Sequence, residues 1–274
     1  MGTLYVVGTP IGNLEDLSSR ALRVLREVSL VAAEDTRKTG ALFSRFDIHT
    51  PLTSYFEHNK LTKLQAILEA LGRGDVALVS EAGLPGLSDP GYELIRAAIE
   101  AGVPIVPIPG PVAAITALVV SGLPTDRFTF LGFLPRKASE RRRALQEVAA
   151  ERRTLVLYEA PHRLAGCLED IESVLGDRPI AVARELTKLH EEIYRGTVHS
   201  AREHFAHGEV RGEVTLVVGG AAEEAVAWDE ERVRRALEQA LSQGLDRKEA
   251  IRHITQESGW PRREVYRLAT HLEA

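Results

Sequence analysis

The chain has 274 residues, 44% of them hydrophobic and 27% charged, with a formal net charge of −5 at pH 7. This length and composition exclude a disordered or fibrous protein and allow about two domains with sizeable cores. The acidic balance argues against indiscriminate nucleic-acid binding by the whole surface, although local basic patches can still bind phosphates. The beginning lacks a secretory pattern and no apolar run reaches the roughly 18 residues of a membrane span, so we expect a cytoplasmic protein without a membrane partner.

Short apolar runs alternate with amphipathic segments through the first half of the chain, as in a βαβ fold. We expect strands at residues 3–7, 30–33, 76–79 and 103–108, and helices at 17–28, 61–71, 92–100 and 111–120. Pro111 suits the first turn of the last of these helices. Because apolar strands buried between helices are typical of parallel pairing, this half predicts a mostly parallel sheet.

A boundary near residues 122–124 precedes a second alternation of strands and helices. We expect strands at 128–133, 154–158, 180–183 and 214–218, with helices at 139–151, 163–174 and 201–205. After Gly219-Gly220 three helices are predicted, at 231–243, 247–257 and 261–271, with Asp246 as an N-cap. The predicted fold class is therefore α/β, with an N-terminal α/β domain (1–122), a second α/β domain (123–222) and a C-terminal helical, helix-turn-helix-like domain (223–274).

Three Gly/Pro-rich loops follow predicted strands. They are GTPIGNL at 8–14, SEAGLPGLSDPG at 80–91 and IPGPVAAI at 108–115. Ligands of parallel α/β sheets bind at the carboxyl ends of strands, and glycines let backbone atoms approach a ligand closely. The alternatives are a tight turn for the first loop and a stiff surface loop, with Asp89 as turn former, for the second. The first loop matches neither the dinucleotide nor the phosphate-loop fingerprint, which disfavours hydride transfer and nucleotide hydrolysis.

Two basic stretches are candidates for RNA contact. RKASERRR at 136–143 includes Arg136, and the last predicted helix carries Arg262, Arg263 and Arg267. Each stretch is also compatible with a solvated helix face. We expect no metal site, because His199, His204 and His207 have no cysteine partner and no H-E-x-x-H spacing, and we expect Cys167 to be a buried, inert thiol.

Six motifs occur in order along the chain and together carry a family resemblance. They are GTPIGNL (8–14), AEDTR (33–37), SEAGLPGLSDPG (80–91), PGP (109–111), EAPHR (159–163) and RELTK (184–188). With them the sequence resembles the ribosomal RNA small subunit methyltransferase I family, which belongs to the tetrapyrrole methylase-like class that uses S-adenosylmethionine. The resemblance covers about residues 3 to 220, and it implies 2′-O-methylation of a cytidine in the decoding region of 16S rRNA by a homodimer.

The resemblance also implies a cofactor site between the two α/β domains. Its residues would be Pro10, Gly83, Leu84, Leu87, Ala113 and Ala114 from the first domain, with Tyr158 and the strand 213–216, which includes Val214, from the second. The sequence departs from the family at Glu81 and Leu84, where Asp and Thr are more usual. Contacts through the backbone would survive both departures.

A ribose hydroxyl is a weak nucleophile until its proton has an acceptor, so the chemistry calls for a positioned base. The candidates for the base are Glu34, Asp35, Glu185 and His58. With Glu34, Asp35 and Glu185, Lys188 is predicted to be catalytic, because it could orient the acceptor ribose or its phosphate, while Arg37, Arg163 and Arg184 are candidates for holding RNA. Two alternatives stay open, because Asp35 could cap a helix that begins at Thr36 and Arg163 could pair with Glu159.

Two other functions compete with rRNA methylation. One is a methyltransferase of the same fold that acts on a tetrapyrrole, which would leave the basic C-terminal region without a role. The other is a non-catalytic RNA-binding protein that keeps the fold as a scaffold, which the intact loops near residues 8, 83 and 110 disfavour.

Overall fold

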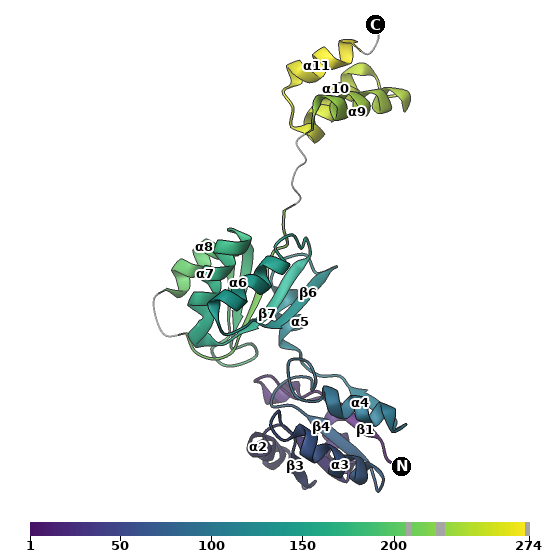
Figure 1. Cartoon of the computed structure of the whole chain (residues 1–274), viewed down its shortest axis with the longest axis vertical. Coiled ribbons are helices and arrows are strands. Elements are labelled where there is room, and N and C mark those ends of the chain that lie inside the picture. Colours follow the sequence, from purple (N-terminus) through teal and green to yellow (C-terminus); the bar gives the residue numbers. More distant parts are fainter. Residues whose placement is uncertain (207–209, 223–227, 272–274) are drawn as a thin grey trace. The chain divides into compact units, whose positions relative to one another are not determined.

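The computed structural model describes residues 1–206, 210–222 and 228–271, and its first half forms a five-stranded parallel sheet (Figure 1). In spatial order the strands are β3 (Leu52–Ser54), β2 (Leu30–Ala33), β4 (Val76–Val79), β1 (Leu4–Val7) and β5 (Ile105–Ile108). The parallel sheet is as predicted, except that the short strand β3 was not expected. Because all five strands are parallel, the three Gly/Pro-rich loops leave the sheet at the same edge.

Helices cover both faces of this sheet. Helices α1 (Ser19–Glu27) and α2 (Thr36–Phe46) lie on one face, where Val24, Leu25 and Phe43 pack against Val31 and Val79. Helices α3 (Lys60–Leu71) and α4 (Tyr92–Glu100) lie on the other face, over side chains that alternate with the first set along the strands. This alternation is the pattern of a strand buried on both sides, and it explains why β2 and β4 are apolar throughout.

The second sheet also has five strands, but most of its pairs are antiparallel. In spatial order the strands are β6 (Phe128–Phe133), β7 (Thr154–Glu159), β10 (Val214–Val218), β8 (Pro179–Arg184) and β9 (Glu192–Thr197). Only β6 and β7 are parallel, while β10 pairs antiparallel with β7 and β8, and β8 with β9. Strand β9 was not expected from the sequence, since its residues EIYRGT are half polar and lie at the edge of the sheet.

The two faces of the second sheet have different partners. Helices α6 (Ala138–Glu147), α7 (Leu164–Leu175) and α8 (Val198–Phe205) gather on one face, as Figure 1 shows. Helix α5 (Ala113–Val120), which follows the first sheet in the chain, packs on the other face against β7 and β10. The prediction that α5 begins at Pro111 was wrong: Val112 is the N-cap, so Pro111 lies before the helix.

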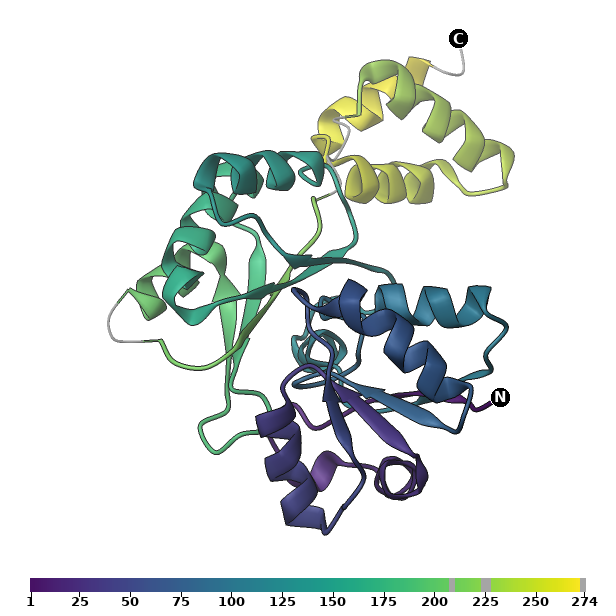
Figure 2. The same cartoon turned by 60° about the horizontal axis from the view of Figure 1, so that its bottom comes forward.

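Residues 222–274 form a separate compact unit, which we call the C-terminal unit and whose described residues form three helices, while residues 1–221 form the N-terminal unit. Figure 2 shows helices α9 (Glu230–Ser242), α10 (Arg247–Ser258) and α11 (Arg262–His271) as a small bundle. Its core contains Val233, Leu237, Ile251 and Leu268. As predicted, Asp246 caps α10, and it accepts a hydrogen bond from the amide of Glu249 at 2.7 Å. Within the described residues no helix is long and apolar enough to cross a membrane.

Candidate functional site

The three Gly/Pro-rich loops touch one another at the edge of the first sheet. A Cβ at Gly110 would lie 2.8 Å from backbone atoms of Gly8, and a Cβ at Gly8 would lie 2.7 Å from the Cα of Gly110. The amide of Thr9 donates to the carbonyl of Gly83 at 2.9 Å, and the amide of Gly83 donates back at 3.1 Å. Gly83 holds this position with a φ of +83°, which favours glycine. The glycines therefore join the loops into one platform.

A cavity of about 360 Å³ opens beside this platform. Six of the eight residues expected to bind the cofactor line it, namely Gly83, Leu84, Leu87, Ala113, Tyr158 and Val214. Pro10 lines a neighbouring cavity instead, and Ala114 is not among the lining residues. The cavity is thus built by loops of the first sheet together with strands β7 and β10 of the second.

Tyr158 connects the two sheets at this cavity. Its ring packs against Phe130 and Phe133, with ring centroids 5.2 Å and 5.4 Å away. Its hydroxyl oxygen accepts a hydrogen bond from the amide of Ala114 at 3.2 Å. The first amides of a helix have no partner within it, so Tyr158 satisfies one of these donors at the beginning of α5. Burial raises the pKa of Tyr158, which keeps the hydroxyl neutral.

Carboxylates dominate the charged side chains of the cavity. Glu34, Glu81, Asp89 and Glu213 line it, with Glu81 and Asp89 both from loop 80–91, and among the described residues no Lys, Arg or His lines it. Burial, together with the nearby charge of Glu34, raises the pKa of Asp89 to about 7. The amide of Glu81 donates to Glu34 Oε2 at 3.0 Å, which fixes that carboxylate at the rim. A cation is the complementary ligand for such a site.

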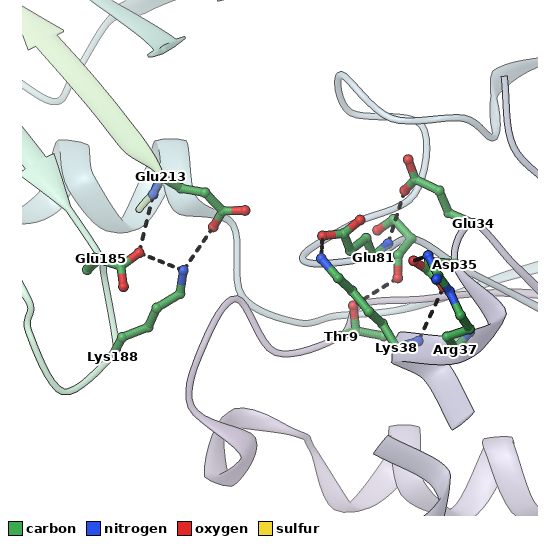
Figure 3. A network of polar contacts seen from close by, with 10 residues as sticks. Thr9, Glu34, Asp35, Arg37, Lys38, Glu81, Glu185, Lys188 and Glu213 are labelled. Atoms are coloured by element: carbon green, nitrogen blue, oxygen red, sulfur yellow. Dashed lines mark hydrogen bonds and ion pairs between the residues drawn. The ribbon is translucent and has the colours of Figure 1, made fainter. Parts of the chain in front are cut away.

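A second cavity, of about 330 Å³, adjoins the first. The two share Ile11, Glu81, Ala82 and Glu213 as a common wall. Lys38 and Lys188 line the second cavity and not the first, and Figure 3 shows them apart from each other, Lys38 with Glu81 and Lys188 with Glu213. The pairing with Glu81 raises the pKa of Lys38, so its ammonium stays charged.

Glu185 and Lys188 form a small network with Glu213. The Lys188 ammonium donates to Glu185 at 2.8 Å and lies 3.4 Å from Glu213 Oε2, while the amide of Glu213 donates to Glu185 at 3.2 Å. The bond from Lys188 lowers the pKa of Glu185. Glu185 has a φ of +50°, and a Cβ at Gly212 would lie 1.8 Å from its carboxylate, so this glycine leaves the space that Glu185 occupies. The structure therefore brings together Glu185 and Lys188, two of the four residues predicted to be catalytic.

Asp35 is the N-cap of α2, which is the alternative that the sequence left open. Its carboxylate accepts from the amides of Arg37 at 2.8 Å and Lys38 at 3.3 Å, and these bonds lower its pKa. Arg37 is exposed and lies 3.6 Å from Asp35. Neither Asp35 nor His58 lines either of the two cavities, so the geometry does not support them as the base.

The arginines predicted to contact RNA divide into two groups. Arg163 is largely buried, lies 3.1 Å from the fully buried Glu159, and donates to the carbonyls of Leu134 and Pro135, so its donors serve the fold. Arg184 pairs with Glu192. The other four, Arg37, Arg136, Arg262 and Arg263, are exposed. In the basic stretch 136–143, Arg141 is buried against Asp170 at 2.5 Å and does not face solvent.

The described residues hold no group of three or more His, Cys, Asp or Glu side chains that could bind a metal ion. His199 pairs with Glu172 at 3.0 Å and His204 with Glu192 at 2.9 Å, while His207 lies outside the described residues. Cys167 is buried, as predicted, and burial raises the pKa of its thiol.

Three site residues were missed by sequence reasoning. Asp89 was interpreted only as a turn former, and Lys38 and Glu213 were not singled out. Lys38 directly follows the motif AEDTR, and Glu213 begins the strand that the resemblance placed at the cofactor. Their positions beside motif residues are the signal that could have identified them.

Comparison with known proteins identifies relatives of the whole chain. The family model of the tetrapyrrole (corrin/porphyrin) methylases matches residues 3–202. A Synechocystis sp. protein named ribosomal RNA small subunit methyltransferase I is 48% identical over 100% of this chain and 99% of its own length. A relative of the same name from Halalkalibacterium halodurans is 46% identical over 97% of this chain and 94% of its own. A relative of the same name from Thermotoga maritima is 47% identical over 80% of this chain and 99% of its own length.

Solved structures show the same fold. A uroporphyrin-III-C-methyltransferase from Thermus thermophilus has a TM-score of 0.55 and 25% identity over 80% of this chain and 94% of its own. The methyltransferase CobJ has a TM-score of 0.60 and 19% identity over 81% of this chain and 95% of its own. A further structure of the Thermus enzyme, with a TM-score of 0.55 and 22% identity over 80% of this chain and 97% of its own, contains S-adenyl homocysteine.

Proposed function

The chain belongs to the ribosomal RNA small subunit methyltransferase I family, within the tetrapyrrole methylases, and from this premise we propose that it transfers a methyl group from S-adenosylmethionine to the 2′-oxygen of a cytidine in 16S rRNA. The observation that carries the proposal is the pair of adjoining cavities, which share a wall and differ in charge. One suits a cationic methyl donor and the other an anionic acceptor.

The residues of the larger cavity fit S-adenosylmethionine. This molecule carries a sulfonium and an ammonium group, and the acidic lining of the cavity offers Glu34 and Asp89 beside Glu81 and Glu213, which pair with Lys38 and Lys188. Leu84, Leu87 and Ala113 supply an apolar wall for the adenine, and the absence of a side chain at Gly83 lets the ligand approach the backbone. When bound, S-adenosylmethionine supplies a methyl carbon whose bond to sulfur breaks, its electron pair staying on sulfur, as the ribose oxygen forms the new bond.

The chain's own task is to position the ribose and accept its proton. Glu81 and Glu213 line both cavities, so they are the acidic residues that would border both the donor and the acceptor. Glu34 holds the amide of Glu81, and Glu185 holds the amide of Glu213, which makes these two predicted residues positioning groups in our proposal. Lys188 lies beside the same wall and would orient the acceptor through its phosphate.

Labelled S-adenosylmethionine tests the proposal when it is incubated with unmethylated small ribosomal subunits, with naked rRNA and with a porphyrinoid. We expect label in the subunits or the rRNA, and mapping should place it on the ribose oxygen of a cytidine. Label on the porphyrinoid alone would favour the tetrapyrrole methyltransferase, and donor binding without transfer to RNA would refute the proposed reaction. The homodimer and the cytoplasmic location stay predictions, which sedimentation velocity and cell fractionation address.

A further inference from the structure

We propose that the smaller cavity, lined by residues of loop 8–14, helix α2 and Lys188, binds the acceptor as a single nucleotide turned out of its RNA strand. This inference rests on the proposed function and extends it, because it assigns the place and the form in which the RNA presents its ribose. We call the smaller cavity the acceptor cavity and the larger one, proposed for S-adenosylmethionine, the donor cavity. The first support is position: the two cavities share Ile11, Glu81, Ala82 and Glu213, so a ribose held in the acceptor cavity lies next to the methyl donor.

The second support is the chemistry of the walls. Apolar side chains line the cavity from two elements, with Pro10, Ile11 and Leu14 from loop 8–14 and Ala41 and Leu42 from α2. Such walls can hold the two faces of a base. Within the described part of the chain no aromatic ring lines this cavity, so the base would be held between aliphatic groups and not by aromatic stacking.

The polar groups of the cavity suit the sugar and the phosphates. Thr9, Thr39 and Ser80 line it with hydroxyls, and the ammonium groups of Lys38 and Lys188 lie apart from each other (Figure 3). The Lys38 side chain is 60% exposed and that of Lys188 is 30% exposed, so phosphates can reach both. Each lysine is paired with a glutamate of the shared wall, Lys38 with Glu81 and Lys188 with Glu213. A phosphate would compete for these lysines and free a carboxylate for the ribose proton.

The third support is size. At about 330 Å³ the cavity lies at the lower end of the range for small-molecule sites, roughly 300–1,000 Å³, which leaves room for one nucleoside but not for a base pair. Enzymes that modify a nucleotide inside a paired region take that nucleotide out of the stack. The acceptor must therefore be unpaired, or become so, before its O2′ reaches the shared wall.

Filling the cavity is the direct test. Ala41→Phe places a ring in the cavity from an exposed position of α2, while Ser44→Phe adds the same ring to the same helix at an exposed position that lines neither cavity. We expect Ala41→Phe to lower kcat/KM for small subunits by at least about tenfold and Ser44→Phe to change it less than about twofold. Both variants should bind S-adenosylmethionine as the unaltered protein does, because neither residue lines the donor cavity.

A binding measurement without turnover provides the second readout. We expect Lys38→Ala to weaken binding of a single-stranded rRNA oligonucleotide and to reduce the slope of log affinity against log salt by about one, as for the loss of one phosphate contact. Lys63→Ala in α3, which lines neither cavity, should leave the slope unchanged.

The outcomes separate this inference from the function on which it rests. No methyl transfer to RNA by the unaltered protein would overturn the proposed function and this inference with it. Transfer by the unaltered protein together with equal kcat/KM for Ala41→Phe and Ser44→Phe would overturn the inference alone. An unchanged salt slope in Lys38→Ala would also contradict it.

Discussion

The N-terminal and C-terminal units differ in what their charged side chains do. In the N-terminal unit, charges are placed around cavities, where Glu34, Glu81, Asp89 and Glu213 line the proposed donor cavity and two lysines line the proposed acceptor cavity. In the C-terminal unit, Arg262 and Arg263 are exposed at the beginning of α11. Enclosed charges select and position a ligand, whereas exposed cations mainly attract phosphates.

The relatives fit this division. The Thermotoga maritima relative matches 80% of this chain with 99% of its own length, so about a fifth of this chain has no counterpart in it. The C-terminal unit, at residues 222–274, is of about that size. We infer that the N-terminal unit contains the complete catalytic apparatus and that the C-terminal unit adds affinity for the ribosomal substrate.

The largest effect is expected from Arg163→Ala, which should lower the stability of the N-terminal unit and leave that of the C-terminal unit unchanged. The substitution leaves Glu159, whose side chain is fully buried, without its cation, and breaking a buried pair in this way costs about 3–5 kcal/mol. The chain has two tryptophans, Trp228 and Trp260, both in the C-terminal unit. Circular dichroism in urea should therefore show early unfolding of the N-terminal unit while the tryptophan fluorescence transition stays in place.

Arg96→Ala is the control, because Arg96 forms an exposed ion pair with Glu100 on α4 and its loss should not move either transition. If Arg163→Ala unfolds like the unaltered protein but binds rRNA more weakly, Arg163 contacts RNA and is not needed to stabilise Glu159.

The next largest effect is expected from Gly110→Val. A Cβ at this position meets the backbone of Gly8 at 2.8 Å, and backbone cannot rotate away as a side chain can. The loops at the sheet edge must then separate, and we expect the affinity for S-adenosylmethionine, measured by calorimetry, to fall at least about tenfold. Unchanged affinity would show that the donor does not depend on this platform.

The raised pKa of Asp89 predicts that stability and affinity for S-adenosylmethionine both depend on pH, with effects of intermediate size. Its pKa is raised to about 7 in the folded chain, chiefly by burial, from 3.8 for an ordinary Asp. The folded state therefore keeps a proton that the unfolded state loses, so this group's contribution to stability declines as the pH rises from about 4 to 7. Affinity for the cationic donor should change in the opposite direction and rise several-fold between about pH 6 and 8 as Asp89 ionises. Asp89→Asn should flatten the affinity profile, and an equally steep profile in that variant would exclude Asp89 as its source.

A smaller effect, confined to RNA affinity, is expected from the double variant Arg262→Ala, Arg263→Ala. Loss of two phosphate contacts should reduce the salt slope of rRNA binding by about two. Binding of S-adenosylmethionine should not change, because both arginines lie in the C-terminal unit. A double variant with unaltered rRNA affinity would mean that α11 is only a solvated helix face.

The smallest effect is expected from Gly40→Ala in α2, where a Cβ meets nothing within 4 Å. Alanine favours the helix over glycine by about 0.5–1 kcal/mol, so the N-terminal unit should become slightly more stable in urea. Destabilisation would show that α2 is strained where it borders the acceptor cavity.

The sequence predicted those parts of the fold that depend on local pattern. Strands Leu30–Ala33 and Val76–Val79 were recognised because every residue in them is apolar, as burial on both faces requires. Strand Glu192–Thr197 was missed because an edge strand keeps polar residues and so lacks that pattern. The antiparallel pairing of β10 with its neighbours was not predicted either, since an alternation of strands and helices does not determine strand direction.

The sequence predicted the parts of the site that lie in motifs. It did not predict which residues far apart in the chain come close together in the fold. The glycines of the loops marked the donor cavity, but nothing in the sequence indicated that Gly8 and Gly110 touch. Glu81 and Glu213 are far apart in the chain, yet both line the two cavities, because Glu213 directly precedes strand β10 of the second sheet. The raised pKa of Asp89 depends on the same folding, because burial is its main cause.

The division between the two units is tested most directly by single-turnover methyl transfer to small subunits, measured over a range of subunit concentrations with saturating S-adenosylmethionine. We compare the double variant Arg262→Ala, Arg263→Ala with the unaltered protein. We expect the double variant to need a higher subunit concentration for half-maximal rate but to reach the same maximal rate, because the donor and acceptor cavities are intact. A lower maximal rate at saturating substrate, with S-adenosylmethionine still bound, would contradict it by placing part of the catalytic apparatus in the C-terminal unit.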